Sequence, residues 1–140
     1  MKQIENDLNL QVAHVGRMHR QRAEEAFSAL GLHVGQEHLL FALWEHDGLP
    51  QSQLASSLCL DLSTVNKMVQ HMEMAGFLER RQDPQDARVS RVYLTERGVA
   101  LQEPLLRAWK ALEERTVQGL NETEKVLLRR LLLHMSANLS

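Results

Sequence analysis

The sequence contains one cysteine, Cys59. A lone cysteine cannot form a disulfide within the chain, and it supplies no cysteine cluster for a metal ion. Long apolar runs are also missing, because none approaches the roughly 20 residues that a membrane-spanning helix needs. The polar, acidic segment from Met1 to Leu10 has no signal-peptide core. We therefore expect a single cytoplasmic domain of 140 residues that does not associate with membranes.

A surplus of positive charge is absent as well. The formal net charge at pH 7 is −2, and residues 61–97 hold 6 Lys or Arg against 6 Asp or Glu. The segments before and after that stretch are not strongly basic either. Bulk electrostatics therefore does not predict nucleic-acid binding, and such a function has to depend on where particular side chains lie.

Signatures of catalysis and of metal binding are missing too. The sequence has no H-E-x-x-H motif, no glycine-rich phosphate loop and no nucleophile–base pairing. His14 and His19 are five residues apart, as are His33 and His38, whereas imidazoles three or four residues apart share a helical face. The sequence therefore predicts a protein that is not an enzyme, with no metal site and no cofactor.

Apolar periodicity and turn residues predict helices, then one β-hairpin, then further helices. The segment Asp47-Gly48-Leu49-Pro50 is expected to break the chain between helices. Pro104 is expected to kink the helix after the hairpin, and Asn121 with Glu124 forms a capping-box pair that opens the last helix. The expected helices run from about Ile4 to Leu30, Gly35 to His46, Gln51 to Leu58, Leu62 to Ala75, Glu96 to Gln118, and from the capping box to Asn138, and the strands from Phe77 to Gln82 and Arg88 to Leu94.

The short helices joined by a tight turn suggest a helix-turn-helix. In the second of them Leu62, Val65, Val69 and Met72 share one face. The opposite face combines hydroxyls, amides and a cation, which are groups that hydrogen-bond to base edges in a major groove or to phosphates. A solvated surface would show the same pattern, so the helix alone leaves both interpretations open. The candidates for DNA contact are Ser63, Thr64, Asn66, Lys67, Gln70 and His71.

The hairpin carries four arginines, Arg80 and Arg81 in its first strand and Arg88 and Arg91 in its second. A protruding turn with arginines can lie along the minor groove, where narrow A·T-rich stretches attract guanidinium groups. Asp86, two residues before Arg88, is placed to hold that guanidinium in a fixed direction. The alternative is a surface ion pair that contributes little.

The stretch from Asp83 to Gly98, DPQDARVSRVYLTERG, resembles the wing signature of the MarR family, D-P-x-D-x-R-x-x-x-V-x-L-T-x-x-G. Gln53-Leu54-Ala55 and Ser63-Thr64-Val65 fall where that family has its helix-turn-helix, and Gly76-Phe77-Leu78-Glu79-Arg80 resembles its helix exit. The resemblance extends over nearly the whole chain in order and spacing.

The resemblance implies an α+β fold that is mainly α with a small β-hairpin wing. One domain, residues 1–140, would combine a winged helix-turn-helix lobe (about 35–95) with a helical dimerisation lobe (about 1–34 and 96–140). It implies a homodimeric transcriptional regulator, usually a repressor, that binds double-stranded DNA at a pseudo-palindrome. By position, Arg88 is the wing-tip arginine and Asp86 its orienting partner.

Many members of the family release DNA when a small phenolic or aromatic acid binds between the two lobes. Cations or imidazoles beside apolar walls would suit such a ligand, although amphipathic helices carry the same residues for packing. The alternative function is a winged-helix dimer that acts mainly through protein–protein contacts, which the balanced charge of residues 61–97 would suit. The candidate pocket residues are His14, Arg17, Met18, His38 and Trp44.

Peroxide-sensing members of the family keep a reactive cysteine near the N-terminal helices, with tyrosine partners. Cys59 lies instead between the two helices of the helix-turn-helix, and the only tyrosine is Tyr93. We therefore expect Cys59 to be a small buried side chain rather than a redox switch.

Overall fold

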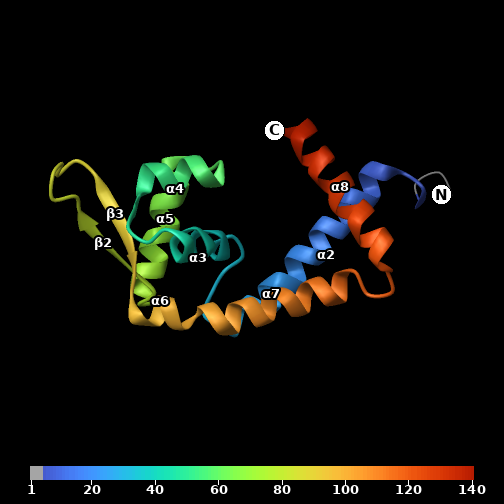
Figure 1. The fold of residues 1–140 in the computed structure, drawn as a ribbon, viewed down its shortest axis with the longest axis horizontal. Coiled ribbons are helices and arrows are strands. Elements are labelled where there is room, and N and C mark those ends of the chain that lie inside the picture. The colour runs from blue at the N-terminus through green and yellow to red at the C-terminus, as the bar shows by residue number, and fades with distance from the viewer. Residues whose placement is uncertain (1–4) are drawn as a thin grey trace.

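The computed structural model describes residues 5–140, so Ile4, the expected start of the first helix, lies outside the described part. The molecule is elongated (Figure 1): the sheet gathers with α3, α4 and α5 at one end, the start of α2 and the end of α8 lie at the other, and α7 runs between them. The elements are α2 (Leu8–Ser28), α3 (Gln36–Glu45), β1 (Leu49–Pro50), α4 (Gln51–Leu58), α5 (Leu62–Met74), β2 (Leu78–Gln82), β3 (Ser90–Leu94), α6 (Glu96–Ala100), α7 (Gln102–Thr116) and α8 (Glu122–Leu139). The predicted fold class, mainly α with a small β-sheet, is confirmed.

Helix caps lie where the sequence places them. The Asp61 side chain accepts a hydrogen bond from the Thr64 amide at the start of α5, and Gly76 follows that helix with φ +85°. Asn121 and Glu124 form the expected capping box of α8. These signals act through neighbouring backbone groups, which is why the sequence alone locates them.

The segment before α4 separates two helices and also forms a short strand. Leu49 lies opposite Val92 and Pro50 opposite Arg91, so β1 adds a third antiparallel strand in the order β1-β3-β2. The predicted hairpin is present as β2 and β3, and the third strand was not expected. A strand of two residues is too short to show alternating apolar and polar side chains, and proline is uncommon in strands except at a sheet edge. Only the pairing with β3 therefore identifies these residues as a strand.

The helix expected after the hairpin is divided into two helices. α6 ends at Ala100 and α7 begins at Gln102, so Pro104 lies in the first turn of α7. Proline has no N–H to donate to the carbonyl four residues earlier, which here is the carbonyl of Ala100. The interruption therefore falls just before the proline, where the missing hydrogen bond would have belonged.

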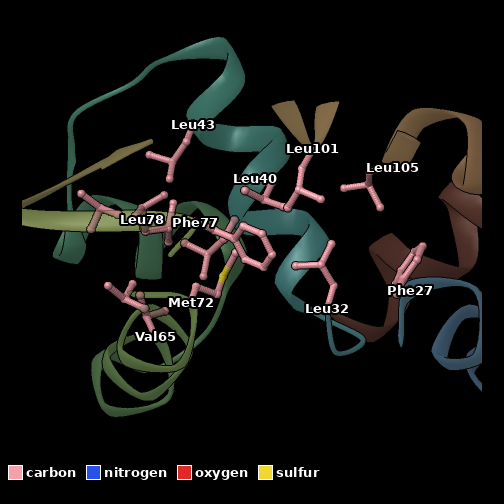
Figure 2. Close-up of a cluster of buried hydrophobic side chains, with 14 of the residues drawn as sticks. Phe27, Leu32, Leu40, Leu43, Val65, Met72, Phe77, Leu78, Leu101 and Leu105 are labelled. Carbon is pink, nitrogen blue, oxygen red and sulfur yellow. The ribbon is translucent and has the colours of Figure 1, made fainter. Parts of the chain in front are cut away.

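The core runs from the sheet to the junction of α2 and α7. Figure 2 shows Val65, Met72, Phe77 and Leu78 at one end of this cluster and Phe27 at the other. The side chains between them are Leu32, Leu40, Leu101 and Leu105, and all of these residues are buried. The lobe formed by α3, α4, α5 and the sheet is therefore packed directly onto the helices α2 and α7.

Parts of α2 and α8 leave apolar side chains uncovered. No residue of α8 is buried, and the chain exposes 10343 Å². A compact monomer of 16.0 kDa exposes about 7,400 Å². The exposed apolar residues of these two helices include Leu8, Val12, Val15, Met18, Val126, Leu127, Leu131, Leu132 and Leu133.

No helix within residues 5–140 has the length and apolarity needed to cross a membrane.

Candidate nucleic-acid interface

Helix α5 presents a polar face to solvent. Val65, Val69 and Met72 are buried beneath it, as predicted. Leu62, which was also expected on the buried face, is 48 % exposed because it begins the helix beyond the edge of the packed surface. The six residues predicted to contact DNA are all exposed, namely Ser63, Thr64, Asn66, Lys67, Gln70 and His71.

The first turn of α5 is organised by one carboxylate. Asp61 Oδ1 accepts hydrogen bonds from the Thr64 amide (2.7 Å) and from the Ser63 hydroxyl (2.9 Å). Hydrogen bonds from the Thr64 side chain and amide, followed by the Ser63 hydroxyl, hold the pKa of Asp61 below its usual value. While the Ser63 hydroxyl donates to Asp61, it presents only acceptor lone pairs to the outside.

At the tip of the wing, the strands β2 and β3 with their connecting loop, Arg88 is exposed and held in direction. Its Nε donates to Asp86 Oδ1 at 3.1 Å and its Nη2 to Asp86 Oδ2 at 3.2 Å, while the side chain stays 91 % exposed. The Arg88 guanidinium, more than any other group, keeps the pKa of Asp86 below its usual value. This is the geometry that the spacing of the two residues predicts.

Arg91 lies at the base of the wing. Its Nε donates to Asp83 Oδ2 at 2.6 Å, and its Nη1 donates to the Gly48 carbonyl at 2.9 Å. The Arg91 guanidinium and the Gln85 amide lower the pKa of Asp83. Arg91 therefore ties β3 to the turn before β1, and its donors are directed largely into the protein.

The two arginines of β2 are paired as well. Arg80 Nε lies 2.6 Å from Glu73 Oε1 on α5, so this ion pair connects the wing to the end of α5. Arg81 pairs with Glu79 and lies over the Tyr93 ring, 4.3 Å from its centroid. Each wing arginine thus has a carboxylate partner, and the wing carries little free charge.

An open cavity of about 1010 Å³ lies between α5 and the segment that joins α2 to α3. Arg20, His33, Lys67 and His71 give it a basic lining, and Glu37, only 3 % exposed, is the one carboxylate among the described residues that line it. Of the five predicted pocket residues, His38 alone lines this cavity. Thr64, Lys67 and His71 therefore belong both to the predicted DNA-contacting set and to the cavity wall.

The other four predicted pocket residues lie elsewhere. The Trp44 indole donates to the Gly98 carbonyl at 3.2 Å and packs beside Phe41, so it joins α3 to α6. The remaining three, His14, Arg17 and Met18, are exposed on α2 outside the lining of this cavity. Their spacing in the sequence places them on α2 but does not show which turn of that helix lies beside α5.

Cys59 is exposed, which corrects the expectation that it is buried. It caps α4 in the left-handed conformation, with φ +55°, at the surface turn between α4 and α5. Among the described residues, no group of three or more His, Cys, Asp or Glu side chains is arranged to hold a metal ion.

Comparison with known proteins agrees with this geometry. Residues 32–90 match the model of the MarR family. The chain is 28 % identical over 121 residues to the HTH-type transcriptional repressor IacR of Pseudomonas putida, covering 86 % of this chain and 72 % of that protein.

Solved structures extend the likeness to almost the whole chain. The transcriptional regulator SlyA superposes with a TM-score of 0.84 at 25 % identity, covering 96 % of this chain and 94 % of that one. CouR from Rhodococcus jostii RHA1, bound to p-coumaroyl-CoA, gives a TM-score of 0.79 at 26 % identity, covering 94 % and 93 %. IacR and SlyA are transcriptional regulators, and over residues 32–90 the chain matches the MarR family of winged helix-turn-helix transcriptional regulators.

Proposed function

We propose that the protein is a repressor that binds a pseudo-palindromic DNA site as a homodimer and is released by a small aromatic anion. The observation that carries this proposal is the exposed polar face of α5 beside an outward, oriented Arg88. An α-helix with such a face fits a major groove, and an exposed guanidinium at a wing tip fits the neighbouring minor groove.

The uncovered apolar surface supports a homodimer. α2 and α8 expose apolar residues such as Val15 (52 %) and Leu131 (44 %), and a second copy of the chain would cover them. The chain also exposes about 3,000 Å² more than a compact monomer of its mass would. A two-fold axis through these helices would present two copies of α5 to one face of a DNA duplex.

The cavity supports release by an aromatic anion. It is large enough for a drug-sized ligand, and its basic side chains would attract an acid group. CouR, a relative, binds p-coumaroyl-CoA, which combines an aromatic acyl group with negative charges. Because Lys67 and His71 lie on α5 and in the cavity wall, a bound anion would compete with DNA for the same side chains.

Selection of bound sequences from random duplex DNA by the purified protein tests the proposal. We expect a two-fold symmetric site with half-sites about 10 bp apart centre to centre. Recovery of no preferred sequence at physiological salt would contradict it. That outcome would favour the protein–protein alternative, which the paired wing arginines would suit.

The selected duplex then tests the effector. Titration of the protein–DNA complex with hydroxybenzoates and hydroxycinnamates should release DNA at concentrations that leave the fold intact. Persistence of the complex with every such acid would remove the aromatic anion from the proposal without affecting the DNA site.

A further inference from the structure

Gln51 is one of the few buried polar side chains within residues 5–140. It is 8 % exposed and begins α4, the first helix of the helix-turn-helix. Its Nε2 donates a hydrogen bond to Oδ1 of Asn66, at 2.8 Å, across the α4–α5 contact. Asn66 is exposed on α5, on the opposite flank from the cavity residues Thr64 and His71.

This hydrogen bond fixes which end of the Asn66 amide faces outward. Asparagine has one acceptor oxygen and one donor NH2 group, so with Oδ1 turned to Gln51 the NH2 is turned away from it. The usual recognition of adenine by asparagine needs both ends, the NH2 for N7 and the oxygen for N6. Asn66, held in this way, offers only its donor end.

The direction of the Gln51 amide has its own physical cause. Gln51 is the first residue of α4, where backbone N–H groups without helical partners create a positive end that favours an oxygen nearby. A glutamine oxygen directed to the helix end would leave the NH2 group for Asn66, and the NH2 group is the one that donates to Asn66 in the structure. Burial strengthens the pair, because the Gln51 NH2 has little access to water as a substitute acceptor.

We propose that Gln51 is a positioning residue that sets Asn66 to read a hydrogen-bond acceptor on the base edge, guanine first and thymine second. Guanine presents two acceptors in the major groove, N7 and O6, and thymine presents O4. Cytosine, which presents only its N4 amine, is disfavoured at that position, and adenine, which presents one acceptor (N7) beside its N6 amine, is weaker than guanine. The inference rests on the proposed function, since it requires α5 to lie in a major groove.

Two substitutions reverse the polarity in different ways. Gln51→Glu replaces the donor with a carboxylate, so the pair persists only if Asn66 turns its amide over and presents Oδ1 outward. Asn66→Asp keeps Gln51 and presents a carboxylate oxygen outward. Both variants are expected to favour cytosine or adenine where the wild type selects guanine or thymine, at one position in each half-site.

The experiment is selection from random duplex DNA with the wild type, both variants and Gln53→Glu. Gln53 is exposed two residues further along α4, so its substitution makes the same change of charge without touching Asn66. At the affected position we expect the ratio of cytosine and adenine to guanine and thymine to rise about tenfold or more, the discrimination that a good base contact supplies. Thermal unfolding of each variant confirms that the proteins compared are folded.

The outcomes separate the two proposals. If the wild type selects no symmetric site, the proposed function fails. If the wild type selects a site and Gln51→Glu selects the same one, Gln51 does not set the Asn66 amide and the inference is overturned, whatever Asn66→Asp does. A shift in Gln51→Glu and Asn66→Asp but not in Gln53→Glu supports it.

Discussion

Asp86 holds Arg88 through two parallel hydrogen bonds, from Nε to Oδ1 and from Nη2 to Oδ2, while Arg88 projects into solvent. A paired guanidinium of this kind is directed before it meets a ligand, so less side-chain entropy is lost on binding. The pair is on the surface and adds little to stability. Its contribution is therefore expected in DNA affinity and not in the free energy of unfolding.

Replacement of Arg88 by alanine should weaken binding to the selected DNA site by about 1–3 kcal/mol. Asp86→Asn, which keeps the arginine and removes its charged partner, should weaken binding less than Arg88→Ala does. Fluorescence anisotropy titrations measure both. Arg107→Ala is the matched control, because Arg107 is also exposed and paired with a carboxylate, Glu103, but lies on α7. Equal affinities for Arg88→Ala and the control would remove Arg88 from the interface.

The free energy of unfolding should fall at low pH because Asp83 becomes protonated. Hydrogen bonds from Arg91 and from the Gln85 amide lower the pKa of Asp83 in the folded protein below its usual value of 3.8. A carboxyl group whose pKa is lowered on folding stabilises the folded protein at pH values above the pKa that the group has in the unfolded chain. This stabilisation is lost as the pH falls through the pKa that the group has in the folded protein. The loss is therefore expected below about pH 4.

Asp83→Asn removes this titrating group, so the free energy of unfolding should fall less steeply in the acid range than in the wild type. Urea unfolding followed by circular dichroism at a series of pH values measures the slope. Glu114→Gln, at an exposed carboxylate of α7, is the control. The same acid slope in Asp83→Asn and wild type would show that the Arg91 contact does not persist in solution.

Gly98 allows α6 to approach the end of α5. A methyl group added there would overlap the backbone carbonyl oxygen of Phe77 and come within 3.2 Å of Leu94 Cδ2. Gly98→Ala should therefore destabilise the protein by about 1–3 kcal/mol or more, because backbone atoms cannot move aside cheaply. Gly16→Ala is the control: Gly16 lies in α2 with nothing within 4 Å of the added carbon. It should be neutral or stabilising by about 0.5–1 kcal/mol, since alanine favours helix. Equal midpoints in denaturant would contradict the close approach.

Local signals explain which parts of the fold were predictable. α4 was expected from Gln51 to Leu58 and has those bounds, and α5 differs from its expected bounds by one residue. Their caps and apolar spacing act within a few residues, so the sequence is sufficient. β1 depends on pairing with Val92 and Arg91, more than 40 residues away, and nothing within its own two residues indicates it.

The same distinction applies to the candidate site. The exposed face of α5 and the Asp86–Arg88 pair follow from periodicity and from a two-residue separation. The cavity lining and the Gln51–Asn66 hydrogen bond join elements through tertiary packing, and Arg20 and Gln51 were therefore missed. The buried carboxylate of Glu37 also gave no signal, because its position in the helix suits a solvated first turn equally well.

A charge placed on α8 should separate the proposed dimer. Leu131→Glu puts a carboxylate into the apolar surface that two copies would bury, and a two-fold interface contains the substitution twice. The dimer dissociation constant should rise at least about a hundredfold, by about 3 kcal/mol or more. Sedimentation velocity measures it. Val99→Glu, at an exposed apolar residue of α6, should leave the dimer intact. A wild type that sediments as a monomer would contradict the dimer directly.

Substitutions of Arg20 and of Lys67 should affect ligand affinity and DNA affinity differently. Both line the cavity, but only Lys67 lies on the exposed face of α5. Arg20→Ala should weaken binding of an aromatic carboxylate about tenfold, since hydrogen bonds to charged groups contribute about 1.5–3 kcal/mol, and should leave DNA affinity unchanged. Lys67→Ala should weaken both and lower the salt dependence of DNA binding by about one unit of slope if it contacts a phosphate.

Calorimetry with a hydroxybenzoate and anisotropy with the selected duplex measure the two affinities. Arg22→Ala is the control, because Arg22 lies on the same helix outside this cavity. If Arg20→Ala and Arg22→Ala bind the acid equally well, the anion does not occupy the cavity. If Lys67→Ala loses acid binding but keeps its DNA affinity and salt slope, the two ligands do not share that side chain, and competition at α5 is not the route of release.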